Sequence, residues 1–285
     1  MFALGLGAAL VSSAMFYVGI VLQAVEAKRA PKSQSLRLSL IGSLLRRPRW
    51  VLGLVLGLVG IAPQVVALAY APFVVVQPAL AVGLLLVLVL GARMLDESVG
   101  PLELAGVVAI IGGIALVAWG APSHTEQHRG GIAVIAVVAA LGVGAVVPFA
   151  VRGSRLDTAM AVTIASGFGF AAGNIATKLF GDDVGSGHYW SAGAWAVSGL
   201  AMGVVATITN MTAFQRLPST IVVPVLTGVQ TFLPIVLEPF FLREHWGSAV
   251  ADGIPIGAGL ALALVGTVVL TRTRAVSDVV AAASR

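Results

Sequence analysis

Cysteine is absent from this 285-residue chain, and charged residues are scarce. Without cysteine the chain can form neither a disulfide framework nor a thiolate metal site. Only 10% of its residues are charged, whereas soluble globular domains carry about 25%. The sequence also lacks the glycine-rich loops that hold the phosphates of nucleotides. These absences exclude a soluble globule and exclude direct use of ATP.

Apolar residues, in contrast, make up 58% of the chain. Runs of roughly 20 apolar residues are long enough to cross a bilayer as helices. The sequence therefore predicts an all-α polytopic membrane protein with nine transmembrane helices near residues 2–22, 50–70, 73–92, 101–119, 131–151, 158–178, 190–214, 219–241 and 253–271. The first run is a helix and not a secretory signal, because the basic residues Lys28, Arg29 and Lys32 follow it instead of preceding it.

Basic residues predict the orientation of these helices. Alternating sides along the nine helices puts fourteen Lys and Arg residues on one side and three on the other. Basic loops face the cytoplasm, so we expect a cell (inner) membrane protein with its N-terminus outside and its C-terminus inside. Residues 26–49 form the basic cytoplasmic loop, in which LRLSLIGSLL (36–45) is too short to cross and is expected at the membrane interface. This topology also explains the net charge of +5 without nucleic acid as a partner.

An internal repeat organises the chain. Pro72 and Pro78 open an apolar stretch that leads to a short acidic turn ending in glycine, and Pro218 and Pro224 open a second one. Each copy continues into an apolar run with two glycines seven apart, which are Gly106 and Gly113 in the first copy and Gly259 and Gly266 in the second. Small residues of this kind let helices pack closely. Helix packing is therefore the expected role of the four glycines.

The second copy begins five crossings after the first. Because five is an odd number, the two copies have opposite orientations in the membrane. We therefore predict an inverted repeat of helices 1–4 (residues 1–122) and 6–9 (residues 157–285), with helix 5 (residues 123–156) between them. Inverted repeats are typical of transporters that work by alternating access.

The two halves, the turns GARMLDESVG and FLREHWG, and the paired glycines resemble the drug/metabolite transporter superfamily with its EamA-like fold. The long basic loop and the segment LAYAPFVVVQPALAV are similar to the NIPA-type magnesium transporter branch. The resemblance implies a transporter, with magnesium as the substrate of that branch. That branch carries an acidic residue on its second helix, where this chain reads IAPQVVALAY with Gln64.

Polar residues within the apolar runs are the candidates for a binding site. Gln64 and Asn210 hold equivalent places in the two copies, eight residues before Pro72 and Pro218. Pro78 and Pro224 each free a backbone carbonyl, because proline cannot donate a helix hydrogen bond. The predicted substrate-binding residues are Gln64, Asn210, Pro78, Pro224, Gln230 and Asn174, with Ser12 and Ser166 as further candidates. The alternative is that the amides hold helices together by hydrogen bonds.

Such a neutral pocket predicts a small neutral or zwitterionic organic substrate, with a divalent cation as the alternative. A membrane scaffold is the third reading, and a homodimer is left open. Glu238 is a candidate for coupling to a proton or cation, and Lys178 is its candidate partner. No cofactor, resident metal or enzymatic reaction is expected. His124, Glu126 and His128, in a predicted outer loop, are the candidate residues for an external metal site.

Overall fold

The computed structural model describes residues 2–71, 73–120, 131–154, 157–241 and 250–283, and these residues form helices and no β-strand. The long elements are α1 (Phe2–Arg29), α7 (Pro101–Gly120), α8 (Ile132–Ala150), α9 (Ala159–Gly185), α10 (Tyr189–Arg216), α11 (Ser219–Phe241) and α12 (Ile254–Ala283). The shorter ones are η1 (Lys32–Gln34), α2 (Leu38–Leu44), α3 (Pro48–Val59), α4 (Ile61–Tyr70), α5 (Phe73–Ala81), α6 (Gly83–Leu95) and η3 (Val250–Gly253).

Seven segments of the described chain are long and apolar enough to cross a membrane. Two further apolar stretches, Ser219–Pro234 and Ile254–Leu270, are shorter. The all-helical class is therefore confirmed, whereas the count of nine crossings and the inverted repeat stay predictions. Three helices continue beyond the predicted crossings, since α1 runs to Arg29, α9 to Gly185 and α12 to Ala283.

Two of the predicted crossings are each made of two helices. The crossing that begins at Pro48 is α3 followed by α4, which meet at Gly60. The next crossing is α5 followed by α6, which meet at Val82. Pro63 and Pro78 each remove one backbone donor close to these junctions, and this weakens the helix locally.

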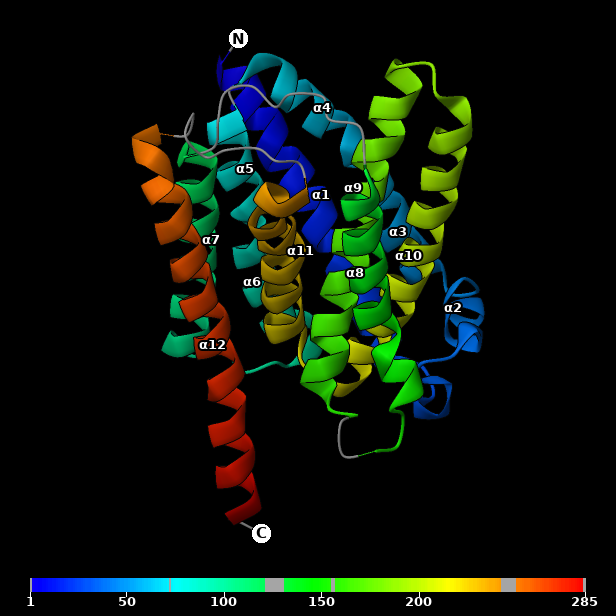
Figure 1. Ribbon diagram of the computed structural model, residues 1–285. Coiled ribbons are helices and arrows are strands. Elements are labelled where there is room, and N and C mark those ends of the chain that lie inside the picture. Colours follow the sequence, from blue (N-terminus) through cyan, green and yellow to red (C-terminus); the bar gives the residue numbers. More distant parts are fainter. Residues whose placement is uncertain (1, 72, 121–130, 155–156, 242–249, 284–285) are drawn as a thin grey trace.

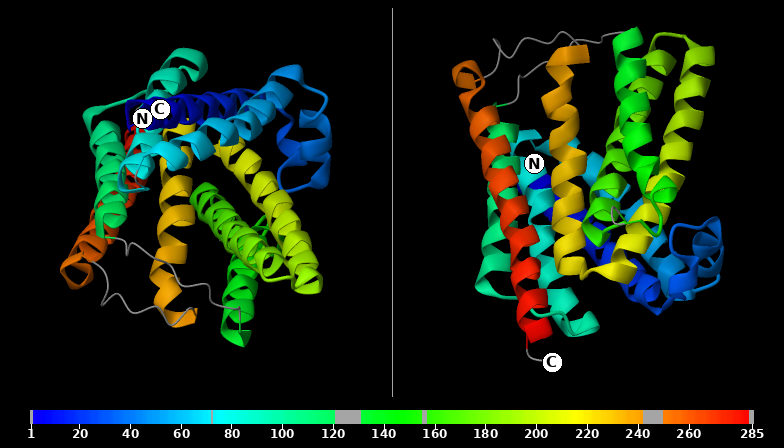
Figure 2. Two further views of the ribbon diagram at one scale, coloured as in Figure 1. Left: turned by 90° about the horizontal axis from the view of Figure 1, so that it is seen from above. Right: turned by 60° about the horizontal axis from the view of Figure 1, so that its bottom comes forward.

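The helices form a bundle in which α7 pairs with α12, and α9 pairs with α10 (Figure 1). The helix α11 lies between these two groups in both Figures 1 and 2. The helix α1 packs against α3, α4, α5 and α6. Lys28 at the end of α1 and Ser219 at the start of α11 both contact Glu97, so these two helix ends lie at the same end of the bundle.

We call that end of the bundle the basic end, because the basic residues 28–49 and the beginning of α11 lie there. The N-terminus and the start of α5 lie at the other end (Figure 1). Between the two ends, large apolar side chains face outward, including Leu200 at 73% exposure and Val197 at 68%. An apolar surface of this extent would be unfavourable in water and fits the acyl chains of a bilayer.

Candidate functional site

The acidic turn of the first copy places Glu97 at the basic end. The helix α6 ends at Leu95, and Asp96 takes a left-handed conformation with φ 53°. The backbone N–H groups of Asp96 and Glu97 both donate to the carbonyl of Gly91. The helix thus ends in a left-handed residue, and the turn directs the Glu97 side chain back into the bundle, where the residue is only 8% exposed.

Each of the two carboxylate oxygens of Glu97 accepts two hydrogen bonds. Lys28 Nζ and the backbone N–H of Ser219 donate to Oε1, each at 2.7 Å. The Ser219 hydroxyl (3.0 Å) and the Thr220 N–H (2.9 Å) donate to Oε2. The two backbone donors belong to the first turn of α11, where the helix dipole also favours an anion. One side chain therefore joins α1, the α6–α7 turn and α11.

These donors stabilise the ionised form of Glu97. Burial by itself would raise the pKa of the carboxyl, but the hydrogen bonds from Lys28, Thr220 and Ser219 outweigh burial and lower the pKa below its ordinary value. Glu97 is consequently ionised at neutral pH. A carboxylate with four donors has no free capacity to bind a further cation closely.

Gly91 permits the close approach of α6 to α11. A Cβ atom at this position would lie 2.8 Å from Thr220 Cγ2 and 2.9 Å from Glu97 Oε2. Both distances are shorter than carbon atoms tolerate, so any larger residue would push α6 away from the first turn of α11.

Three further contacts join the first copy to α10 at the same end. The Ser35 hydroxyl donates to Gln215 Oε1 at 2.7 Å, the Leu36 N–H donates to Thr212 Oγ1 at 3.0 Å, and Trp50 Nε1 donates to Met211 Sδ at 3.2 Å. With the Glu97 contacts they form what we call the basic-end seam. Since Ser35, Thr212 and Ser219 are all buried, the seam is shielded from solvent.

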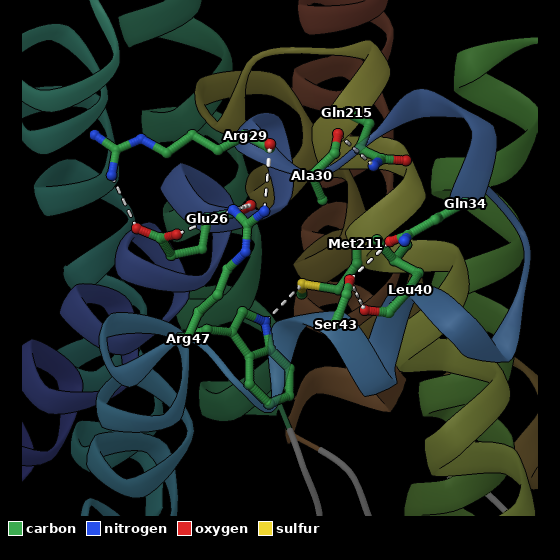
Figure 3. A network of polar contacts seen from close by, with 10 residues as sticks. Glu26, Arg29, Ala30, Gln34, Leu40, Ser43, Arg47, Met211 and Gln215 are labelled. Atoms are coloured by element: carbon green, nitrogen blue, oxygen red, sulfur yellow. Dashed lines mark hydrogen bonds and ion pairs between the residues drawn. The ribbon is translucent and has the colours of Figure 1, made fainter.

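A second buried carboxylate, Glu26, holds the basic loop together (Figure 3). Arg29 and Arg47 each pair with it, at 2.9 and 3.2 Å. Arg47 also donates to the backbone carbonyl of Glu26 at 3.1 Å. These contacts fix the start of α3 against the end of α1, so Arg29 and Arg47 serve the fold.

Asn210 lies inside the bundle on α10 with an unsatisfied acceptor. The residue is 5% exposed, and its Oδ1 atom is buried without a hydrogen-bond partner in the described part of the chain. A buried polar atom without a partner costs about 1 to 3 kcal/mol. Unsatisfied atoms of this kind are rare in folded proteins, and they call for an explanation such as a ligand.

The other predicted binding residues are dispersed. Gln64 is half-buried on α4, which packs against α1 and α3, while α10 packs mainly against α9. Pro78 and Gln230 are half-buried, Pro224 is buried within an unbroken α11, and Asn174 is exposed on α9. In the described structure, no hydrogen bond joins Gln64 to Asn210.

Two serine hydroxyls of α1 donate hydrogen bonds to backbone carbonyls at the two helix junctions. The Ser12 hydroxyl donates to the Gly60 carbonyl at 2.7 Å, and the Ser13 hydroxyl donates to the Leu80 carbonyl at 2.6 Å. Adjacent residues of α1 therefore support both broken crossings. Ser166 instead donates within its own helix, to Thr163.

The remaining candidates lie at or beyond the limits of the described residues. Glu238 belongs to α11, but its side chain is outside the described part. His124, Glu126 and His128 lie outside the described residues altogether. Lys178 is exposed on α9. Within the described residues, no group of three or more His, Asp or Glu side chains could hold a metal ion.

Sequence reasoning did not identify Glu97 as a functional residue. It recognised the acidic turn only as a marker of the repeat, because the partners of Glu97 are 69 and 122 residues away in the chain. The only signal in the sequence was a short turn that carries two acids, Asp96 and Glu97, and is followed by glycine and proline.

The helical fold and the outward-facing apolar surface are those of a multi-pass membrane protein. The family model for magnesium transporter NIPA matches residues 1–154. The chain belongs to this family, which confirms the resemblance seen in the sequence. The matched part extends from α1 to the end of α8, and searches of curated proteins and of solved structures find no match.

Proposed function

We propose that this protein is a secondary transporter that moves a small solute by alternating access. The observation that carries the proposal is the basic-end seam, in which the two copies meet through buried polar contacts. Polar contacts can exchange their partners for water when a pathway opens, whereas a continuous apolar core resists separation. The seam would close the pathway on the side of the basic end.

The packing of the paired glycines supports the proposed inverted repeat, and with it the same mechanism. Gly106 lies against Gly266, and Gly113 lies against Gly259, so that each pair joins the first glycine of one copy to the second glycine of the other. This exchange is what a two-fold relation between two antiparallel helices produces. We therefore retain the division into residues 1–122, 123–156 and 157–285, with nine crossings, as part of the proposal.

The substrate site is centred on Asn210. Its unsatisfied carbonyl oxygen would accept a hydrogen bond from an N–H or O–H group of a substrate, and Gln230 on the neighbouring α11 supplies a second half-buried amide. Gln64 and the carbonyls near Pro78 would contact the substrate in another state of the cycle. Neutral groups of this kind favour a small neutral or zwitterionic organic solute.

Magnesium is the second candidate, and the family match favours it. Mg²⁺ prefers six oxygen ligands, carboxylates among them, and retains several waters. The two buried carboxylates described above, Glu26 and Glu97, are already paired with basic side chains. A magnesium pathway through this chain would thus carry a hydrated ion past neutral oxygens.

Transport into proteoliposomes separates the two candidates. We would measure Mg²⁺ entry with a trapped fluorescent indicator and uptake of labelled neutral and zwitterionic solutes, with and without a pH gradient. The variants Asn210→Leu and Asn210→Asp are compared with the wild type. Asp keeps an oxygen and adds charge, so it would preserve or raise Mg²⁺ entry but weaken binding of a neutral solute.

The organic-solute proposal predicts saturable uptake of at least one solute that both variants reduce. Mg²⁺ entry that Asn210→Leu abolishes and Asn210→Asp retains would replace it with the cation reading. If neither class of solute enters, the scaffold reading is favoured instead. We further expect a multi-pass protein of the cell membrane with its N-terminus outside. A homodimer stays a prediction. We propose no catalysis and no cofactor.

A further inference from the structure

Part of the basic loop carries exposed positive charges that take no part in the contacts described above. We call residues 31–49, with η1 and α2, the basic lobe. Lys32, Arg37, Arg46 and Arg49 are exposed there, and within the described part of the chain no ion pair neutralises any of them. Arg47, in contrast, is paired with Glu26. The lobe therefore presents four positive charges outward.

Apolar side chains lie beside these charges. On α2, Leu40 and Leu44 are fully buried against the bundle. Leu38 and the following Leu45 are seven residues apart, so they share the opposite side, and they are 72% and 52% exposed. Leucines exposed next to arginines are unfavourable in water, but they suit the boundary between headgroups and acyl chains.

The lobe has a fixed position beside the bundle. It projects sideways from the other helices at the basic end (Figure 2). Ser35 and Leu36 attach it to α10 through Gln215 and Thr212, and Gln215 also donates to the carbonyls of Ala30 and Pro31. The Ser43 hydroxyl donates to Gln34 and to the Leu40 carbonyl (Figure 3). These hydrogen bonds attach the lobe directly to α10.

We propose that the basic lobe is a binding surface for anionic phospholipids. The four cations would contact the headgroup phosphates, while Leu38 and Leu45 enter the outermost part of the acyl region. Charge complementarity selects anionic over zwitterionic lipids. This inference concerns a site separate from the substrate pathway, and it holds whichever solute is transported.

The test is a lipid titration of the purified full-length protein in a neutral detergent, followed by native mass spectrometry. Phosphatidylglycerol is compared with phosphatidylcholine. The variant Arg46→Gln/Arg49→Gln is matched by Arg93→Gln/Arg272→Gln, which removes two exposed arginines elsewhere. Each basic residue near an anionic surface contributes about fivefold to affinity, so the lobe variant should bind phosphatidylglycerol roughly thirtyfold more weakly, while the matched variant stays within about twofold of the wild type.

Two further measurements distinguish the source of the phosphate and the role of the lobe. Inorganic phosphate should not displace the lipid any better than chloride at equal ionic strength. Phosphatidylglycerol should raise the melting temperature of the wild type but not that of the lobe variant, because the lobe is attached to α10. Should Arg46→Gln/Arg49→Gln fail to fold, Lys32→Gln/Arg37→Gln takes its place.

Equal loss of affinity in the lobe variant and the matched variant would overturn the proposal, since it would mean only general attraction between a basic protein and anionic lipid. Unchanged affinity in the lobe variant would overturn it as well. Displacement by inorganic phosphate alone would replace the lipid with a free anion. None of these results depends on whether the chain transports a solute.

Discussion

At the residue scale, Asn210 combines a cost to stability with a proposed role in binding. Its Oδ1 atom is buried without a partner. Asn210→Leu removes this unsatisfied acceptor, so we expect the folded state without substrate to be as stable as the wild type, or more stable by about 1 kcal/mol. Substrate binding should weaken by about 1 to 2 kcal/mol, which is the worth of one or two neutral hydrogen bonds.

The two effects are measured by thermal unfolding in detergent and by substrate affinity in proteoliposomes. Thr177→Leu is the control, because Thr177 is exposed on the neighbouring α9 and is not among the predicted binding residues. It should alter neither quantity. A destabilised Asn210→Leu with normal substrate affinity would assign Asn210 to helix packing instead.

Glu97 provides a prediction about pH. Its pKa is lowered in the folded state from an ordinary value of 4.5, so the stability that it contributes is complete above pH 4.5 and is lost as pH falls through the lowered pKa. Between pH 7 and pH 5 we expect no change in this contribution. Glu97 therefore does not make the stability of the protein sensitive to pH in the physiological range.

Glu97→Gln removes the charge while keeping the shape of the side chain. We expect it to lower the free energy of unfolding by about 2 to 3 kcal/mol at pH 7, the typical value of charged, buried hydrogen bonds. The difference between the wild type and the variant should shrink below pH 4.5. A difference that stays constant across that range would show that the carboxylate charge does not hold the seam.

At the element scale, the pairing of α7 with α12 depends on glycine. A Cβ atom at Gly113 would lie 2.6 Å from the carbonyl oxygen of Gly259, whereas one at the adjacent Gly112 would meet only the end of the Leu262 side chain, at 3.2 Å. Gly113→Ala should therefore destabilise the protein by about 1 to 3 kcal/mol. Gly112→Ala should be nearly neutral in the same melting experiment, and equal effects of both would contradict this packing.

The glycine pairs also show what could be predicted from the sequence. Their spacing placed them on helix faces that pack, and the structure brings them together as antiparallel pairs. The broken crossings could not be predicted in the same way. Both α3–α4 and α5–α6 form continuous apolar runs. At their junctions, Ser12 and Ser13 of α1, a helix distant in the sequence, donate to the carbonyls of Gly60 and Leu80.

For the candidate site, the sequence singled out Asn210 as a polar residue in an apolar run. That its oxygen lacks a partner depends on how α10 packs, which no local pattern records. Glu97 was missed for a related reason, since short acidic turns are common at helix ends and only tertiary contacts distinguish a buried one.

At the scale of the whole molecule, the distribution of charge predicts the topology. A reporter fused after Arg285 should be active only in the cytoplasm, and a reporter inserted within residues 124–129 should be active only outside. The reason is that fourteen of seventeen basic residues fall on one side in the nine-crossing arrangement. Finding both reporters on one side would mean that a crossing has been miscounted.

The opening of the basic-end seam can be measured directly, because the chain has no cysteine of its own. Ser219→Cys places a single thiol at a position that is fully buried under Glu97. Membrane vesicles with the cytoplasmic face outward are treated with an impermeant maleimide, and the labelling rate is compared with that of Ala213→Cys, a fully buried position on α10.

If the seam opens and closes, Ser219→Cys should react slowly but measurably, and several times faster when Glu97→Gln weakens the seam or when a transported solute is added. Ala213→Cys should stay unreactive throughout. Labelling of Ser219→Cys that matches Ala213→Cys under every condition would mean that the two copies do not separate at the basic end, and this result would contradict transport by alternating access through the seam.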